Sequence, residues 1–214
     1  NGDGMTAINI NDKKYLYASS YEELIVRHYI KILKWEPEKD IADRDYVKLL
    51  GILIDKEDFT GMENTIENEV TLIDAIGWVV FSQFQFSKEV PKVLQTTKWT
   101  VDVPANIKSL PIGQNIHVRR EIEKCTVLAE AIPMACAIYL QPLIDKTKFD
   151  LSRAKEIAKE IDEMPIALIP PLGFFLLTHV LKPGKSSAKT WHPESFSLSK
   201  ILRRLSPKWQ GFNS

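Results

Sequence analysis

Apolar residues recur three and four positions apart through much of the chain between residues 20 and 181, and this spacing constrains the fold most. Residues with this spacing share one face of an α-helix. The 214 residues include twelve prolines but only nine glycines, which favours well-formed helices with sharp breaks between them. This length allows one large domain or two small ones, and a hydrophobic content of 44% is enough for a core.

Capping residues and prolines set the expected helix limits. Ser20 and Glu23 form a candidate capping box before the first helix, and Asp150 is a candidate cap for a later one. The expected helices run from the Ser20 box to Pro37, from about Asp43 through Leu53, from Gly61 through Val80, from Gln114 to about Leu143 with a kink or split at Pro133, from Leu151 to Glu163, and from Leu172 to Leu181.

Strand-like alternation is limited to two short regions. Residues 6–17 alternate as a hairpin whose turn is Asn11-Asp12, and residues 98–103 place Trp99, Val101 and Val103 on one face. We therefore expect β structure only in the first 17 residues and in the 95–104 region. The predicted fold class is mainly α with a small β element (α+β): an N-terminal β-hairpin, a helical bundle and an extended C-terminal arm.

Charge divides the chain at residue 181. Residues 182–214 hold seven Lys or Arg and one acid, a net charge of +6, whereas residues 1–181 carry 21 basic and 27 acidic residues, a net charge of −6. We expect a helical globular body over residues 5–181 and a basic, aromatic-containing arm over residues 182–214. Residues 1–4 resemble the remnant of an expression tag before Met5.

The arm contains the candidate partner-binding residues. A short amphipathic helix after Ser197 would carry four apolar residues on one face and basic residues on the other, with aromatic residues on both sides. Aromatic residues and Arg commonly anchor protein interfaces. The arm is expected to dock on a protein partner or a neighbouring subunit; packing on its own domain and binding to nucleic acid or anionic lipid are the alternatives. The candidates are Trp191, Phe196, Leu198, Ile201, Leu202, Arg203, Arg204, Leu205 and Trp209.

Catalytic and metal-binding motifs are missing from the sequence. The four histidines lack a ligand at helical spacing, neither cysteine belongs to a Cys-x-x-Cys pair, and Gly-x-Ser-x-Gly does not occur. Gly184-Lys185-Ser186 resembles the end of a phosphate-binding loop, but His179 stands where the first glycine would be required. We therefore predict a non-enzymatic protein without metal, cofactor or catalytic residue; an enzyme with a dispersed site is the alternative.

The longest apolar run, residues 166–181, has two interpretations. It is shorter than a membrane span and Pro170-Pro171 interrupts it, so no membrane span is expected. Phe174 and Phe175 lie on a helix that is apolar on every face, which predicts either a central core helix or a docking patch.

No secretion signal is visible, and Cys125 and Cys136 are expected to be buried thiols in a reducing compartment.

The order of these segments resembles accessory and virion proteins of tailed bacteriophages, in particular tail assembly chaperones. The likeness covers roughly residues 6–181. It implies a non-enzymatic protein that makes protein contacts within the particle or during its assembly, in the host cytoplasm or virion. The resembling parts are the hairpin of residues 8–17, the helix containing Tyr29, the helix of residues 43–54 containing Leu-Leu-Gly-Ile-Leu, and the segments 110–114, 162–165 and 171–175.

Overall fold

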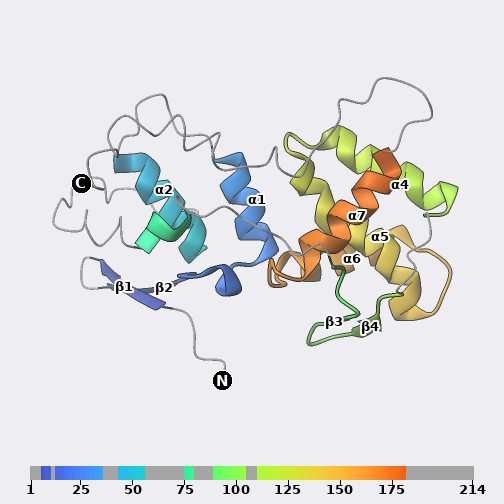
Figure 1. Cartoon of the computed structure of the whole chain (residues 1–214), viewed down its shortest axis with the longest axis horizontal. Coiled ribbons are helices and arrows are strands. Elements are labelled where there is room, and N and C mark those ends of the chain that lie inside the picture. Colours follow the sequence, from blue (N-terminus) through green and yellow to red (C-terminus); the bar gives the residue numbers. More distant parts are fainter. Residues whose placement is uncertain are drawn as a thin grey trace. The chain divides into compact units, whose positions relative to one another are not determined.

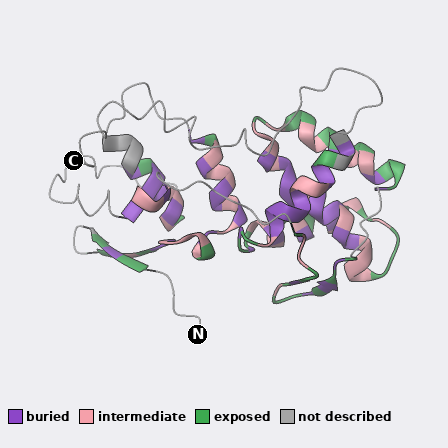
Figure 2. Cartoon of the chain, in the orientation of Figure 1, coloured by how far each residue is buried: buried purple, intermediate pink, exposed green. Residues whose placement is uncertain are grey.

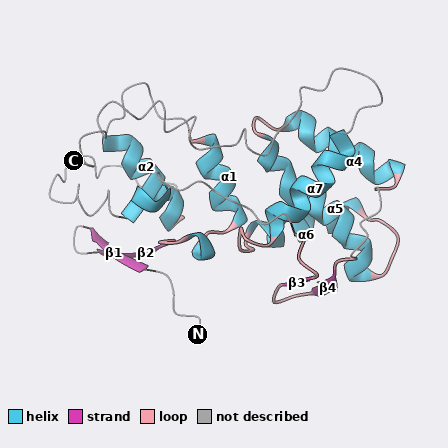
Figure 3. Cartoon of the chain, viewed as in Figure 1, coloured by secondary structure: helices cyan, strands magenta, loops and turns pink. Residues whose placement is uncertain are grey.

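The computed structural model describes residues 6–10, 13–35, 43–55, 75–79, 89–104 and 110–181. These residues are mainly helical with two small antiparallel hairpins, which confirms the predicted fold class (Figures 1 and 3). They form two compact units. The first contains described residues 6–10, 13–24, 34–35, 43–55 and 75–79, and the second contains residues 25–33, 89–104 and 110–181. The expected tag remnant and C-terminal arm lie outside the described residues, so the division at residue 181 stays a prediction.

The first unit begins with the expected hairpin. Strands β1 (Thr6–Ile10) and β2 (Lys13–Tyr17) pair antiparallel, with Ile8 opposite Tyr15. Ile8 and Tyr17 are buried on one face, whereas Leu16 on the other face is exposed. The strand pairing confirms the predicted hairpin, whose expected turn at Asn11-Asp12 lies outside the described residues.

The predicted capping box of Ser20 and Glu23 does not form. Ser20 makes no side-chain cap; instead the Glu23 carboxylate accepts hydrogen bonds from the backbone N–H of Ser19 at 2.7 Å and from its hydroxyl at 3.0 Å. Residues Tyr21–Glu23 form only a short 3-10 helix, η1, because Leu24 returns to extended backbone. The first α-helix starts after this break.

Helix α2 (Asp43–Ile54) buries the apolar face that its spacing predicted. Val47, Leu49, Leu50 and Leu53 are all buried. The Leu53 carbonyl accepts a hydrogen bond from the Ala18 N–H at 3.3 Å, which links the end of the hairpin to the end of this helix. Residues 75–79 are also helical, as expected for the last part of the third predicted helix; the rest of that prediction lies outside the described residues.

The second unit includes nearly all of α1 (Val26–Lys34), whose Val26, His28, Tyr29 and Ile32 are buried. It also contains the hairpin of β3 (Val93–Gln95) and β4 (Thr100–Asp102). The residues predicted to share one face, Trp99, Val101 and Val103, are indeed buried. Strand β3 begins two residues before the predicted region because Val93 pairs with Asp102.

The predicted break in the long helical region is confirmed, but it precedes Pro133. Helix α4 (Ile112–Lys124) ends at Cys125, the 3-10 helix η3 (Leu128–Ala131) follows, and α5 (Ile132–Asp145) then begins. Pro133 therefore lies in the first turn of α5, where its missing N–H leaves no hydrogen bond unmade. The proline starts a helix here instead of kinking one.

Two further helices complete this unit. The Asp150 side chain caps α6 (Leu151–Asp162), as predicted, by accepting hydrogen bonds from the N–H groups of Ser152 at 2.8 Å and Arg153 at 3.3 Å. Helix α7 (Ile169–Leu181) begins three residues before the prediction. Pro170-Pro171 therefore lies inside its first turn, where proline is tolerated.

Helix α5 is the centre of the second unit. It contacts α4, α6, α7, η3 and β4, and Figure 2 shows buried residues concentrated along α5 and α7. The Ile132 side chain of α5 packs against the α7 backbone at Gly173, where an added Cβ would lie 2.4 Å from Ile132 Cγ2. The buried residues of α5 are Ile132, Pro133, Ala135, Cys136, Ala137, Ile138, Leu140 and Gln141.

Candidate functional site

The partner-binding residues predicted from the sequence all belong to the C-terminal arm. They are Trp191, Phe196, Leu198, Ile201, Leu202, Arg203, Arg204, Leu205 and Trp209, and they lie outside the described residues. Their role therefore stays a prediction, and the described part of the chain supplies a separate candidate surface.

The sequence of α7 predicted either a central core helix or a docking patch. Leu172, Leu176 and Leu177 are buried, so one side of α7 belongs to the core. Phe174 and Phe175 are half-buried and lie at the margin of that core. The expectation of a core helix is thus correct for the leucines and only partly correct for the two phenylalanines.

Helix α4 presents apolar residues to solvent. Ile112 is 82% exposed and Ile116 is 45% exposed, and a spacing of four residues places them on the same side of the helix. Gln114 and Val118 are buried on the other side. Gly113 is also exposed, and an added Cβ there would have nothing within 4 Å. We define the α4 surface as Ile112, Gly113 and Ile116.

Specific contacts hold α4 in this orientation. The Arg119 guanidinium donates one hydrogen bond from Nη2 to the Val180 carbonyl at 2.8 Å and another from Nε to Asn115 Oδ1 at 2.9 Å. A cation at the last turn of α7 is also favoured by the helix dipole. The ring of His117 lies 5.6 Å from that of Phe149, between centroids. The α4 surface is therefore carried on an anchored helix.

The sequence contained only a partial signal for this surface. Ile112 and Ile116 have helical spacing, but so do the buried residues Gln114 and Val118 on the opposite side. Which side of α4 faces the core depends on the packing of α5 and α7, so helix periodicity could not identify the exposed apolar side.

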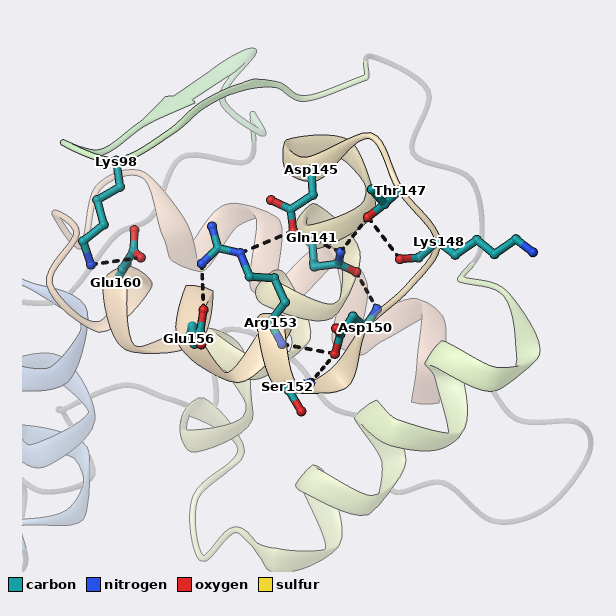
Figure 4. A network of polar contacts seen from close by, with 10 residues as sticks. All are labelled: Lys98, Gln141, Asp145, Thr147, Lys148, Asp150, Ser152, Arg153, Glu156 and Glu160. Carbon is teal, nitrogen blue, oxygen red and sulfur yellow. Dashed lines mark hydrogen bonds and ion pairs between the residues drawn. The ribbon is translucent and has the colours of Figure 1, made fainter.

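A network of polar contacts joins α5 to α6 (Figure 4). Gln141 is 1% exposed; its Nε2 donates to Asp145 Oδ2 at 3.1 Å and its Oε1 accepts from the Asp150 N–H at 2.8 Å. Arg153 Nε also donates to Asp145 Oδ2, at 3.3 Å, while Arg153 Nη1 donates to Glu156 at 2.8 Å. These groups satisfy one another and fix the α5–α6 turn, so the network has a structural role.

Carboxylates on α6 and directly after it contact neighbouring elements. Glu160 accepts hydrogen bonds from Lys98 Nζ at 3.2 Å and Thr96 Oγ1 at 3.5 Å, which ties the β3–β4 turn to α6. Arg27 of α1 forms an ion pair with Glu163. Burial raises the pKa of Asp162 to about 6, although the positive charge of Arg27 lowers it in part.

Both cysteines are present as thiols, but only one is deeply buried. Burial raises the pKa of the Cys136 thiol well above its ordinary value, so Cys136 stays protonated and behaves as a small core residue. Cys125 is half-buried, contrary to expectation, because it follows the last turn of α4; its Sγ donates to the Glu121 carbonyl at 3.0 Å.

Within the described residues, no group of three or more His, Cys, Asp or Glu side chains is arranged to hold a metal ion. None of the helices formed by those residues has the length and apolar character to span a bilayer. No protein-family model matches the chain, and neither does any curated protein or solved structure.

Proposed function

We propose that this chain is a non-enzymatic protein–protein interaction component that serves a tailed-phage particle or its assembly, as a tail assembly chaperone or a structural accessory protein. The observation that carries the proposal is the α4 surface, where two isoleucines point away from the core of their own unit. The basic, aromatic-containing arm adds a second contact region in the sequence.

Covering the α4 surface would be favourable. Removal of an isoleucine side chain from water contributes about 1.5–3 kcal/mol when burial is complete. Isolated exposed apolar residues are common on protein surfaces, but two on one face of an anchored helix provide a small, preformed contact. An interface centred here would be extended by other residues, because two side chains cover much less area than a stable interface needs.

The phage assignment within this proposal comes from the resemblance in segment order. Two of the segments that carry this resemblance lie near the candidate site: segment 110–114 contains Ile112 and Gly113 of the α4 surface, and segment 171–175 lies in the first half of α7. Contacts at these segments would be made with proteins of the particle or of its assembly.

Nucleic acid is the second candidate partner. Seven basic residues in the arm against one acid would favour a phosphate backbone, and such binding weakens strongly as salt increases. Binding to nucleic acid should therefore weaken strongly as salt increases, which distinguishes it from apolar docking at α4.

The experiment compares cross-linked partners of the full chain with those of the double variant Ile112→Ser, Ile116→Ser in lysate of infected host cells. We expect particle or assembly proteins to be cross-linked to the full chain and at least tenfold less to the double variant, since about 1.4 kcal/mol of lost contact energy changes binding tenfold. The fold should be retained because both side chains are exposed.

The matched control is Val93→Ser, which removes an exposed apolar side chain from β3 instead of α4. This variant should retain the partners. Equal cross-linking of the full chain and the α4 double variant would contradict a docking role for the α4 surface, and partners that are unrelated to phage particles would contradict the phage assignment.

A further inference from the structure

The exposed side of α4 continues beyond the α4 surface as a pair of arginines. Arg119 and Arg120 follow Ile116 by three and four residues, so all three share one side of the helix. Both arginines are exposed, whereas Val118 between them and the isoleucine in sequence is buried on the other side. A partner that covers Ile112 and Ile116 therefore meets two positive charges one turn farther along the helix.

Carboxylates of the described residues leave both arginine charges unpaired. Within this part of the chain, neither Arg119 nor Arg120 forms an ion pair. Arg119 donates hydrogen bonds to a side-chain amide of α4 and to a backbone carbonyl of α7, which fix its position and leave its charge uncompensated. The next cation along the helix differs, because Lys124 forms an ion pair with Glu121 at 2.7 Å. The two arginines are thus the charges available to a partner.

On the basis of the docking function proposed above, we propose that the α4 surface and these two arginines bind an acidic segment of a partner protein. The segment presents apolar side chains to Ile112 and Ile116 and carboxylates to Arg119 and Arg120. Burial of the isoleucines stabilises the contact, and the arginines select its charge, since a guanidinium can donate two hydrogen bonds to one carboxylate. Residues 1–181 are acidic as a whole, but charges farther away than about 8 Å are largely screened at physiological salt, so the adjacent arginines dominate.

Other occupants fit this side of α4 less well. The C-terminal arm carries a net charge of +6 and would be repelled by the arginines. Two copies joined through α4 would gather four arginines against the two Glu123 side chains. Anionic lipid would attract the arginines, but Glu123 is exposed one turn beyond them and would be repelled, and two isoleucines on an anchored helix offer little area for insertion. An acidic protein segment satisfies both the apolar and the basic part.

A titration of the isotopically labelled full chain, followed by NMR, tests the proposal with two matched helical peptides. Both carry leucines three and four residues apart; one has glutamate and the other has lysine at the remaining exposed positions. The glutamate peptide should shift the backbone N–H signals of residues 112–124 and bind about tenfold more tightly than the lysine peptide, because two attractive contacts replace two repulsive ones. Added salt should weaken its binding, a result that needs no variant.

Charge reversal locates the selecting group. Arg120→Glu should lower the affinity for the glutamate peptide about fivefold, and the fold should be retained because Arg120 is exposed. The matched control is Lys155→Glu, which reverses an exposed charge on α6 and should leave the affinity unchanged.

Three results would overturn the acidic partner. Equal binding of the two peptides would do so while leaving the docking function of α4 in place, since cross-linking of the isoleucine variant tests that function separately. Shifts by the glutamate peptide that leave out residues 112–124, or an affinity that Arg120→Glu does not change, would remove the role of the arginines. Binding of anionic phospholipid vesicles or duplex DNA at residues 112–124 in place of the glutamate peptide would assign this side of α4 to a membrane or to nucleic acid.

Discussion

Two glycines in the second unit occupy opposite environments. Gly173 lies where α7 meets α5, and an added Cβ would lie 2.4 Å from Ile132 Cγ2. Gly113 lies on the exposed side of α4, where an added Cβ would have no atom within 4 Å. The same substitution should therefore have opposite effects on stability at the two positions.

We expect Gly173→Ala to destabilise the protein by about 1–3 kcal/mol, because overpacking forces α5 and α7 apart. Gly113→Ala should instead stabilise it by up to about 1 kcal/mol, because alanine favours the helix and meets no neighbour. Urea denaturation of both variants measures the difference. A neutral or stabilising Gly173→Ala would show that α5 and α7 separate easily.

Capping residues illustrate what local sequence can predict. The helix cap at Asp150 was predicted correctly, because the Asp150 carboxylate needs only the N–H groups two and three residues later as hydrogen-bond donors. The capping box predicted at Ser20 was wrong. Glu23 instead accepts hydrogen bonds from Ser19, whose hydroxyl also accepts a hydrogen bond from Thr6 of β1 at 2.6 Å. A contact across 13 residues is invisible to a local rule.

At the scale of elements, α7 and α4 show that apolar character does not determine burial. Helix α7 is apolar all round, yet Leu177 is fully buried and Phe175 is half-buried. Helix α4 exposes Ile112 and buries Gln114. The neighbouring helices decide which side of each is covered.

Substitutions on α7 separate its core side from its margin. Leu177→Ala should destabilise the protein by about 2–5 kcal/mol, as expected for a buried leucine. Phe175→Ala should have a smaller effect, about 1–2 kcal/mol, because part of its ring is already in water. Thermal unfolding of the two variants checks this order. A larger loss for Phe175→Ala than for Leu177→Ala would place Phe175 in the core.

At the scale of the whole molecule, charge is segregated along the sequence. Residues 1–181 carry a net charge of −6 and residues 182–214 carry +6, so the arm of one chain can be attracted to an acidic region of a neighbour or a partner. A helix as short as the one predicted after Ser197 is marginal in water by itself. Its apolar residues need a second surface.

Deletion of residues 183–214 should leave a folded, soluble body that has lost an association, as measured by circular dichroism and analytical ultracentrifugation. Arg203→Glu combined with Arg204→Glu should weaken that association and reduce its salt dependence without unfolding the body. An unfolded truncated chain would show that the arm belongs to the core. Salt-sensitive DNA binding that the truncation abolishes would favour the nucleic-acid alternative.

The sequence by itself determined the features that depend on neighbouring residues: the mainly helical class, the first hairpin, the buried side of β4, the Asp150 cap and the break before α5. Period and capping are local, so they can be predicted from a short window. Only the tertiary structure decided that Ile112 and Ile116 face solvent, that Gly173 lies against Ile132 and that Arg27 acts on Asp162. Each of these depends on groups brought together from distant parts of the chain, and helical spacing carries no information about which distant group covers a given face.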